Sequence, residues 1–297
     1  MIDRYHLRYF LAVIDSGNFS RAALACNVSQ PTLSVAIARM EKLLGQTLFH
    51  RTNRRVALTD AGARLAAHAR GIEARFAGAE RAVAGSLPTR LCRIGVLTTL
   101  PAAWIETFLH RHREAGDGER IEIVEGRERE LQDRLTRGRI DCALTILRDG
   151  RDALHRDLLF SEGYALAMAI THPLAGRASI AAADLGNEPM IVRRHCEMLS
   201  DTSRHFTARG VRPLFPARTT SDDRALAYVR SGFGITVMPD CFRDPAIARP
   251  RLEDFTATRD IGLAFAPHSD PTDLRATPLI RTLSRTIMDA QADGGGK

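Results

Sequence analysis

The sequence predicts an α/β protein in three parts: an N-terminal winged helix-turn-helix, a long linker helix and a C-terminal two-lobed α/β domain. Three observations predict it. Residues 1–59 contain short capped helices followed by a basic hairpin. Residues 60–90 are rich in alanine, and residues 91–297 alternate strands with helices. At 297 residues, the chain is long enough for two or three units with separate cores.

The net charge of +7 lies entirely in the first 90 residues. They contain 13 Lys and Arg against 6 Asp and Glu, whereas the remainder contains 29 of each sign. Such asymmetry is typical of a surface that binds a polyanion, because neutralising phosphates releases condensed counterions. The alternative is a merely solvated basic face, so charge alone does not establish DNA as the ligand.

The composition excludes several classes of protein. It is 44% hydrophobic and 26% charged, with no apolar run long enough to cross a bilayer. No signal sequence opens the chain, so we expect a cytoplasmic protein without membrane contact. The five cysteines lack CxxC spacing and an even number, which predicts reduced thiols. We expect neither a metal nor a cofactor.

Apolar spacing and polar caps predict the first two helices. One face of the first helix, which stops at Gly17, is formed by Leu7, Phe10, Leu11 and Ile14. Ser20 is predicted to cap the second helix, in which Ala22 and Ala23 allow close helix contact before Asn27 turns the chain.

A third helix is predicted from the cap Ser29 to the stop signal Gly45, with Pro31 tolerated in its first turn. Its buried stripe comprises Leu33, Ile37, Met40 and Leu44. Its first turn presents short polar side chains suited to base edges in a major groove, namely Gln30, Thr32 and Ser34. This placement is what a recognition helix needs.

Two short strands are predicted next, over Thr47–Phe49 and Val56–Leu58. The hairpin between them is basic and suits backbone phosphate, through Arg51, Arg54 and Arg55. It is therefore interpreted as a wing.

These residues carry a family resemblance. The stretch LRYFLAVIDSGNFSRAALACNVSQPTLSVAIARMEKLLGQTLFHRTNRRVALTDAG resembles the winged helix of LysR-type transcriptional regulators. The resemblance implies that DNA is contacted by Ser29, Gln30, Pro31, Thr32 and Ser34. Many relatives have a basic residue and a glutamine where this chain has Val35 and Ala36. A contact is therefore expected to be missing or moved to Arg39.

The linker helix is predicted from the cap Thr59 to about Gly85. Apolar residues recur along it at alternating spacings of four and three, as in a coiled-coil seam: Leu65, Ala69, Ile72, Phe76, Ala79 and Val83. We expect a dimer that places two recognition helices on a pseudo-palindromic site, and a dimer of dimers stays open. The alternative is a helix packed on its own domain.

The C-terminal half begins with the βαβαβ order of a parallel sheet. The predicted strands are Arg93–Leu97, Arg120–Val124 and Ile140–Ile146. A second set follows, with Tyr164–Ile170, Met190–Val192 and Ile235–Met238, before a return over Ile261–Phe265 and Leu279–Ile287. This return predicts lobe I over about 91–163 and 265–297 and lobe II over about 164–264. The tail, Gly294–Gly296, is expected to be disordered.

This half resembles the effector-binding domain of the same family, related in fold to periplasmic solute-binding proteins, through RLTRGRIDCALTI and ALAYVRSGFGITVMP. The resemblance implies a small-molecule effector between the lobes. Strand ends and helix starts supply the candidate contacts, Thr98, Thr99, Leu100, Arg193, His195, Cys196, Thr220 and Ser221. Their hydroxyls and cations favour an organic anion, although helix capping also explains the hydroxyls.

Cys196 supports an alternative, thiol-based sensing. Adjacent cations and an imidazole lower a thiol pKa, which makes the cysteine more nucleophilic. His195-Cys196 followed by Asp201 resembles the peroxide-sensing branch of the family. That branch has a partner cysteine where this chain has His205, so the resemblance departs there.

Three functional classes follow. The preferred one is a LysR-type, sequence-specific DNA-binding regulator controlled by an effector, with RNA polymerase as a conceivable further partner. A remote second is an enzyme with Cys196 as nucleophile and His195 as base, but no GxSxG, HExxH, Walker or dinucleotide motif supports it, so we expect no enzyme. A third is an architectural DNA binder without an effector, which the cleft-forming C-terminal half disfavours.

Overall fold

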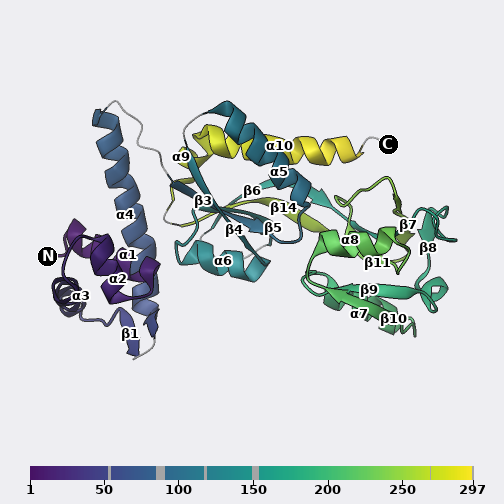
Figure 1. Cartoon of the computed structure of the whole chain (residues 1–297), viewed down its shortest axis with the longest axis horizontal. Coiled ribbons are helices and arrows are strands. Elements are labelled where there is room, and N and C mark those ends of the chain that lie inside the picture. Colours follow the sequence, from purple (N-terminus) through teal and green to yellow (C-terminus); the bar gives the residue numbers. More distant parts are fainter. Residues whose placement is uncertain (53–54, 85–90, 117–118, 149–153, 268, 296–297) are drawn as a thin grey trace.

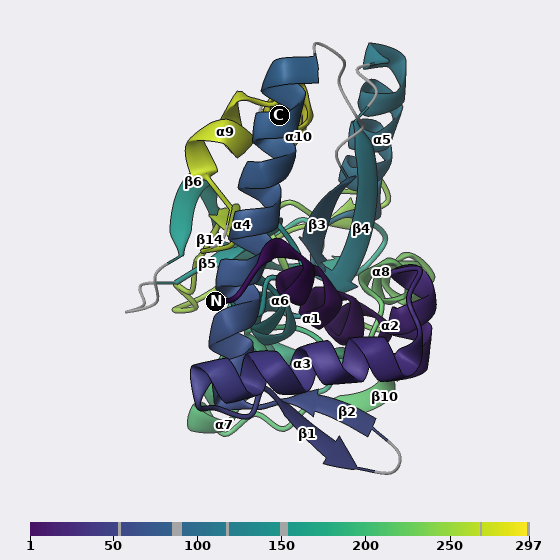
Figure 2. The same cartoon turned by 90° about the vertical axis from the view of Figure 1, so that its left-hand side faces the viewer.

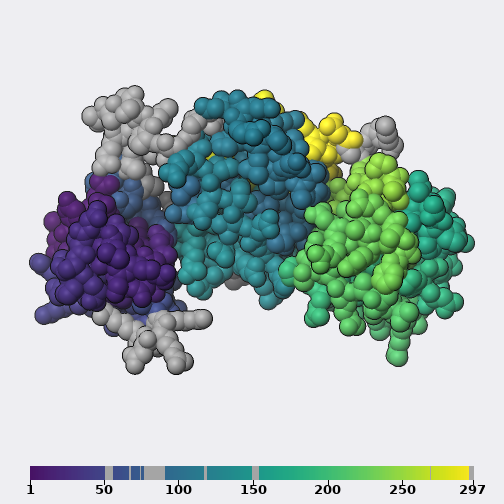
Figure 3. Space-filling model, in the orientation of Figure 1, coloured from purple at the N-terminus to yellow at the C-terminus, as the bar shows by residue number. Residues whose placement is uncertain are grey.

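The computed structural model arranges the chain as an N-terminal unit with its linker helix, followed by two lobes (Figure 1). Figure 3 shows the N-terminal unit and the two lobes as successive masses along the molecule. The structure describes residues 1–52, 55–84, 91–116, 119–148, 154–267 and 269–295.

Three helices and a hairpin form the N-terminal unit: α1 (Arg4–Ser16), α2 (Phe19–Ala25), α3 (Gln30–Leu44), β1 (Phe49–Thr52) and β2 (Arg55–Leu58). Their apolar faces meet in one core, where the Phe10 and Phe49 ring centroids lie 5.2 Å apart and Leu33 and Ile37 are fully buried. Figure 2 shows α3 and the hairpin at the same end of this unit. The shared core therefore fixes α3 and the hairpin relative to each other.

Caps set the ends of these helices. The Ser29 hydroxyl accepts a hydrogen bond from the Thr32 N–H at 3.3 Å, as predicted. Gly45 ends α3 with φ of +63°, a conformation that favours glycine. The prediction of Ser20 as the cap of α2 is wrong: the Asn18 side chain accepts two N–H groups of the first turn and begins the helix there.

Two further predictions in this unit are wrong in detail. Leu44 leaves the predicted buried stripe and is 38% exposed, because it is the last residue of α3. The first strand begins at Phe49 rather than Thr47, after Leu48 has entered the core. Neither difference affects the βαβαβ order predicted for the C-terminal half.

The linker helix α4 spans Asp60–Ala84, and the Thr59 hydroxyl caps it by accepting the Gly62 N–H at 3.0 Å. The residues of its predicted seam lie in two different environments. Leu65 and Ala69 pack into the core of the N-terminal unit, whereas Ile72 and Phe76 are 39% and 45% exposed. The side chains of Ala79 and Val83 lie outside the described residues. The first part of the seam therefore packs within the N-terminal unit, and the second part, Ile72 and Phe76, forms a partly exposed apolar surface.

Lobe I contains β3 (Leu91–Leu97), α5 (Ala102–Ala115), β4 (Arg120–Gly126), α6 (Glu128–Thr136), β5 (Cys142–Leu147), β6 (His155–Glu162), β14 (Arg259–Phe265), α9 (Pro271–Ala276) and α10 (Pro278–Gly295). Its sheet has the order β4-β3-β5-β14-β6. The first three strands are parallel, as predicted, and β14 lies antiparallel between β5 and β6. α5 and α10 cover one face and α6 the other (Figure 1).

Lobe II contains β7 (Tyr164–Ala169), β8 (Ser179–Ile180), a 3-10 turn (Ala182–Leu185), β9 (Pro189–Arg193), α7 (Leu199–Ala208), β10 (Leu214–Thr219), α8 (Asp222–Arg230), β11 (Thr236–Pro239), β12 (Ile247–Ala248) and β13 (Arg251–Leu252). β9 and β10 are parallel, and β7 pairs with β11 and β12. A second core of apolar side chains fills this lobe.

Two boundary predictions need correction. Residues 259–264, assigned to lobe II from the sequence, form most of β14 in the lobe I sheet, because Arg259 pairs with Glu162 and the strand continues beside β6. Gly294 and Gly295 close α10 rather than starting a disordered tail, and Gly296 lies outside the described residues.

Candidate DNA interface and regulatory site

The first turn of α3 presents exposed polar groups. Gln30 and Thr32 are exposed, and Pro31 is exposed beside them. The Gln30 amide donates to the Ser34 hydroxyl at 2.9 Å, and the Ser29 and Thr32 hydroxyl oxygens lie 2.7 Å apart. These contacts fix the amide and hydroxyl groups at the N-terminus of the helix. Such groups can form hydrogen bonds with base edges and with phosphate.

Arg39 and Val35 extend the same surface along α3. Arg39 is exposed, as a residue that contacts phosphate must be. Val35 is 67% exposed, although the sequence suggested only a lost contact there. An exposed apolar side chain on such a helix suits the C5-methyl group of thymine. In the hairpin, the side chains of Arg51 and Arg55 and all of Arg54 lie outside the described residues.

Five of the eight predicted effector contacts line one cavity of about 720 Å³ between the lobes: Thr98, Leu100, His195, Thr220 and Ser221. They meet because β3 ends at Leu97 and α8 begins after Ser221, at facing edges of the two lobes. The Thr98 hydroxyl oxygen is buried and has no hydrogen-bond partner among the described residues. The cavity therefore offers a donor and acceptor to a ligand.

The other three predicted contacts lie elsewhere. Thr99 is 1% exposed and donates to the Glu197 carboxylate at 3.0 Å. Arg193 is 3% exposed, and Cys196 borders a different cavity of about 960 Å³ beside α7. The first cavity is lined instead by four carboxylates and two further basic side chains: Glu106, Glu125, Asp222, Asp223, His110 and Arg113. It is not the cationic pocket that the sequence suggested.

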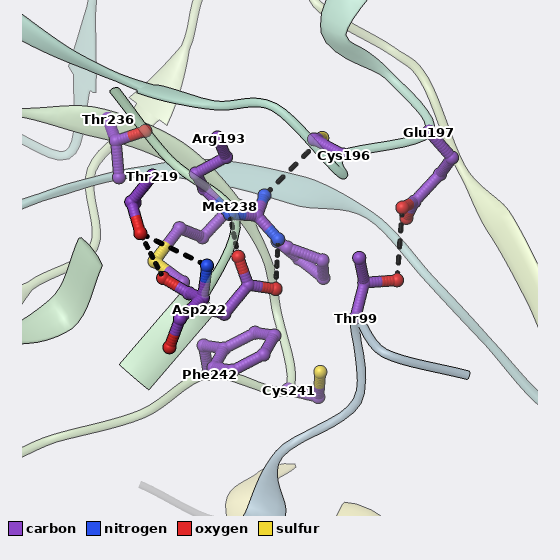
Figure 4. Close-up of polar contacts among 12 residues, drawn as sticks. Thr99, Arg193, Cys196, Glu197, Thr219, Asp222, Thr236, Met238, Cys241 and Phe242 are labelled. Carbon is purple, nitrogen blue, oxygen red and sulfur yellow. Dashed lines mark hydrogen bonds and ion pairs between the residues drawn. The ribbon is translucent and has the colours of Figure 1, made fainter. Parts of the chain in front are cut away.

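Arg193 is neutralised by a buried carboxylate (Figure 4). Its Nε and Nη2 each donate to Asp222 at 2.6 Å, and its Nη1 donates to the Val237 carbonyl at 3.1 Å. The same Nη1 lies 3.4 Å from the Cys196 sulfur. Arg193 is thus a neighbour of the thiol rather than a free cation for an effector.

The Cys196 thiol is a free cysteine in a mixed environment. The sequence suggested a lowered pKa for this thiol, but burial raises the pKa, and the Arg193 guanidinium, which favours the thiolate, offsets only part of that rise. His195 lines the interlobe cavity, whereas Cys196 lines the other cavity.

A buried charge network beside Cys196 was not predicted. Arg259 is 3% exposed and lies within 2.8 Å of the Glu162 carboxylate and 2.7 Å of the Glu197 carboxylate. It also donates to the Thr99 carbonyl at 3.1 Å, and the Tyr164 hydroxyl donates to Glu197 at 2.6 Å. Residues of both lobes therefore meet around one guanidinium.

Glu197 owes its charge to this network. Burial would raise its pKa, but Arg259 and the Tyr164 hydroxyl hold it below the ordinary value. No spacing rule connects these residues, because Arg259 is 62 positions from Glu197 and 97 from Glu162. The available signal was Arg259 itself, a charged residue at the start of the otherwise apolar strand RDIGLAF.

The described residues contain no cluster of three or more His, Cys, Asp or Glu that could hold a metal ion. None of the helices in the described ranges is both long and apolar enough to span a membrane. His205, which stands where a partner cysteine was considered, is buried with its ring edge-on to Phe206 and Phe255.

Comparison with known proteins covers both halves. A family model for the bacterial regulatory helix-turn-helix protein of the lysR family matches residues 5–63, and one for the LysR substrate binding domain matches residues 85–287. A probable hydrogen peroxide-inducible genes activator from Mycobacterium avium is 33% identical over 276 residues, which cover 90% of this chain and 89% of that protein.

Two further relatives extend the comparison. The DNA-binding transcriptional dual regulator OxyR of Escherichia coli K12 is 29% identical, over 97% of this chain and 96% of that protein. A full-length OxyR variant from Pseudomonas aeruginosa has a TM-score of 0.74 at 21% identity, over 97% of this chain and 95% of that one. The latter likeness shows a shared fold.

Proposed function

The chain belongs to the LysR family of transcriptional regulators, and we propose that oxidation of Cys196 by hydrogen peroxide controls its binding to DNA. That the protein is a DNA-binding regulator follows from the family. The observation that carries the proposed input is the Cys196 sulfur 3.4 Å from the Arg193 guanidinium, at the edge of a cavity. The name of the Mycobacterium avium relative, a probable hydrogen peroxide-inducible genes activator, supports peroxide as the signal.

The chemistry needs a thiolate. The Cys196 thiolate attacks one oxygen of the peroxide, the O–O bond breaks, and the leaving hydroxide takes up a proton to form water. The product is a sulfenic acid on Cys196. Arg193 supports the step because its guanidinium stabilises the thiolate and is itself anchored by Asp222.

Contacts of the neighbouring residue connect Cys196 to the interface between the lobes. Glu197 follows Cys196 directly and binds Arg259, Tyr164 and Thr99. Thr99 belongs to lobe I, whereas Cys196 and Glu197 belong to lobe II. A change at Cys196 that displaces its neighbour weakens these contacts and alters how the lobes are held.

On the DNA side, we propose that Gln30, Thr32 and Ser34 meet bases while Arg39 and the basic hairpin meet phosphate. The exposed part of α4 supports self-association as a dimer on a pseudo-palindromic operator, with a tetramer as an extension. The proposal includes RNA polymerase as a partner and the cytoplasm as the place of action, where a bacterial regulatory protein meets DNA. It requires no enzymatic turnover, and the separation of His195 from Cys196 supports that part.

A second candidate input is a small ligand in the interlobe cavity. The unpartnered Thr98 hydroxyl favours it, together with the nearby hydroxyls of Thr220 and Ser221. The carboxylates of this cavity and the neutralised Arg193 favour a polar ligand that is not strongly anionic. Both inputs fit the same DNA-binding role.

A reporter gene under the protein's own operator separates these inputs. Under the proposed function, Cys196→Ser abolishes the peroxide response and leaves operator affinity in unoxidised protein unchanged, whereas Thr98→Val keeps the response. Gln30→Ala relaxes sequence preference in a binding assay against randomised DNA, with each lost base contact costing about 1–3 kcal/mol of discrimination. A full peroxide response from Cys196→Ser would exclude the thiol as the sensor.

A further inference from the structure

Cys196 and Cys241 follow two strands, β9 and β11, that one parallel bridge joins. Met190 of β9 and Ile235 form a parallel bridge, and the Ile191 N–H donates to the Ile235 carbonyl at 2.8 Å. Each cysteine lies six residues beyond its member of the bridged pair. Both thiols therefore follow the carboxyl ends of adjacent strands, β9 and β11, where parallel strands reach the same edge.

One network of buried charges touches both thiols. The Arg259 Nη2 lies 3.4 Å from the Cys241 sulfur, and its Nη1 donates at 2.7 Å to Glu197, the residue after Cys196. On the other side, Arg193 Nη1 bridges the Cys196 sulfur and the Val237 carbonyl of β11. Figure 4 labels both cysteines among the residues around Arg193 and Glu197, with the contact between Arg193 and Cys196 dashed. The contacts thus tie the Cys196 segment to the Cys241 segment.

Both cysteines lie outside regular structure. Cys196 lies in the turn between β9 and α7, and Cys241 lies in the turn that follows β11. Turn segments can shift without breaking a strand ladder or a helix. Cys92 and Cys142 are held within β3 and β5 of the other lobe, and Cys26 lies in the N-terminal unit. Cys241 is thus the other cysteine that the sequence places in lobe II.

We propose that Cys241 is the resolving cysteine that converts oxidised Cys196 into an intramolecular disulfide. The inference rests on the proposed oxidation of Cys196. The Cys241 thiolate attacks the sulfur of the Cys196 sulfenic acid, an S–S bond forms, the S–O bond breaks, and the hydroxide leaves as water after taking up the proton lost by Cys241. Peroxide is the oxidant, and no other reactant is needed.

The disulfide changes the charge network. Both thiols are free in this structure, and a disulfide requires their sulfur atoms to approach to about 2.05 Å. That approach draws Cys196 from Arg193 and Cys241 from Arg259. Glu197 must move with Cys196, so the contact between Glu197 and Thr99 of lobe I is lost. Bond formation in lobe II is thereby coupled to the lobe interface.

The experiment is a peptide map of the oxidised full-length chain. Purified reduced protein is treated with a small excess of hydrogen peroxide, free thiols are alkylated, and tryptic peptides are analysed without reduction. The expected product is HCEMLSDTSR linked to SGFGITVMPDCFR, with the mass of the monomer retained on a non-reducing gel. Cys241→Ala removes this product and increases the trapping of Cys196 by dimedone, whereas the matched control Cys142→Ala keeps the linked peptides.

Other outcomes overturn the inference in distinguishable ways. A sulfenic or sulfinic acid on Cys196 of the native chain, without linked peptides, refutes the role of Cys241 and leaves the proposed function intact. A disulfide between two chains through Cys196 has the same meaning. If Cys196 is not oxidised at all, the proposed function fails and this inference fails with it. The native chain alone decides the matter, so a variant that does not fold leaves the test valid.

Discussion

At the scale of single residues, the Arg193–Asp222 pair organises the surroundings of Cys196. Both side chains are buried, and two hydrogen bonds of 2.6 Å join them. Such bidentate pairing fixes the plane of the guanidinium, which leaves Nη1 directed at Cys196 and Val237. The surroundings of the Cys196 thiol therefore depend on a carboxylate that does not contact it.

Asp222→Asn is expected to destabilise the protein by about 3–5 kcal/mol, because it leaves the buried Arg193 charge without a counterion. Urea unfolding monitored by circular dichroism measures the change. The control is Asp201→Asn, which removes an exposed ion pair with Arg204 and is expected to cost at most about 1 kcal/mol. Equal losses in the two variants would show that the buried pair is not structurally important.

The rate of Cys196 oxidation should rise with pH. Burial holds the pKa of this thiol above its ordinary value despite Arg193, so the reactive thiolate is a minor form at neutral pH. Between pH 6 and 8 the second-order rate constant should therefore increase about tenfold per unit. Timed quenching followed by mass spectrometry of the Cys196 peptide gives this rate. A rate that is independent of pH over this interval would mean that the thiolate is already formed.

Some site residues were predictable, for a topological reason. Thr98 and Thr220 follow strands, and strand ends of the two lobes face the same cavity. The state of Arg193 was not predictable, because its partner lies 29 positions away and no pattern joins them. Likewise, Cys241 carries no local motif, and its proposed relation to Cys196 depends on the bridge between Met190 and Ile235.

At the scale of elements, α4 combines two roles. Its first turns pack on the N-terminal core through Leu65 and Ala69, while Arg4 of α1 lies over the Phe76 ring, 4.5 Å from its centroid. Arg4 also pairs with Glu73 at 3.0 Å. These contacts orient the helix, but they leave Ile72 and Phe76 partly exposed.

Phe76→Asp is expected to weaken self-association, because it places an unpaired charge at the same position of each protomer's seam. The dissociation constant should rise by at least about tenfold, which corresponds to about 1.4 kcal/mol. Sedimentation equilibrium measures it. His68→Asp, an exposed change on the same helix, serves as the control. If Phe76→Asp associates like the native chain, the dimer uses another surface.

The strands that were not predicted, such as β6 and β10, lack a clear alternation of apolar and polar residues. β6 is HRDLLFSE, with charged residues at both ends, and β10 is LFPART, with a proline inside and exposed apolar residues. Both are edge strands of their sheets, where burial on one face imposes little alternation. The helices of the N-terminal unit were predictable because caps and apolar stripes agreed there.

At the scale of the whole molecule, the excess positive charge and the proposed signal input lie in different parts of the chain. The excess positive charge lies in the first 90 residues, whereas the two lobes that contain Cys196 are balanced. Association with DNA therefore depends on the first part of the chain, and the proposed response to a signal depends on the lobes. The linker helix is the covalent connection between them.

This separation predicts the salt dependence of DNA binding. Arg39→Ala should lower the slope of log affinity against log salt by about 0.9 per phosphate contact, hence by about two for a dimer. Arg224→Ala removes an exposed arginine of α8 in lobe II and should leave the slope unchanged. Fluorescence anisotropy with labelled operator DNA at several salt concentrations provides both slopes. A similar loss from both variants would mean that the lobes also contact DNA.

The place of β14 in the lobe I sheet has a consequence for synthesis on the ribosome. β14 lies between β5 and β6, yet residues 163–258 are made after β6 and before β14. At about 5–20 residues per second, this interval lasts roughly 5–20 s. Until it ends, the apolar β5 lacks its neighbour, and its edge is open to other nascent chains. Lobe I thus finishes folding after lobe II, and chaperone demand should peak in that interval.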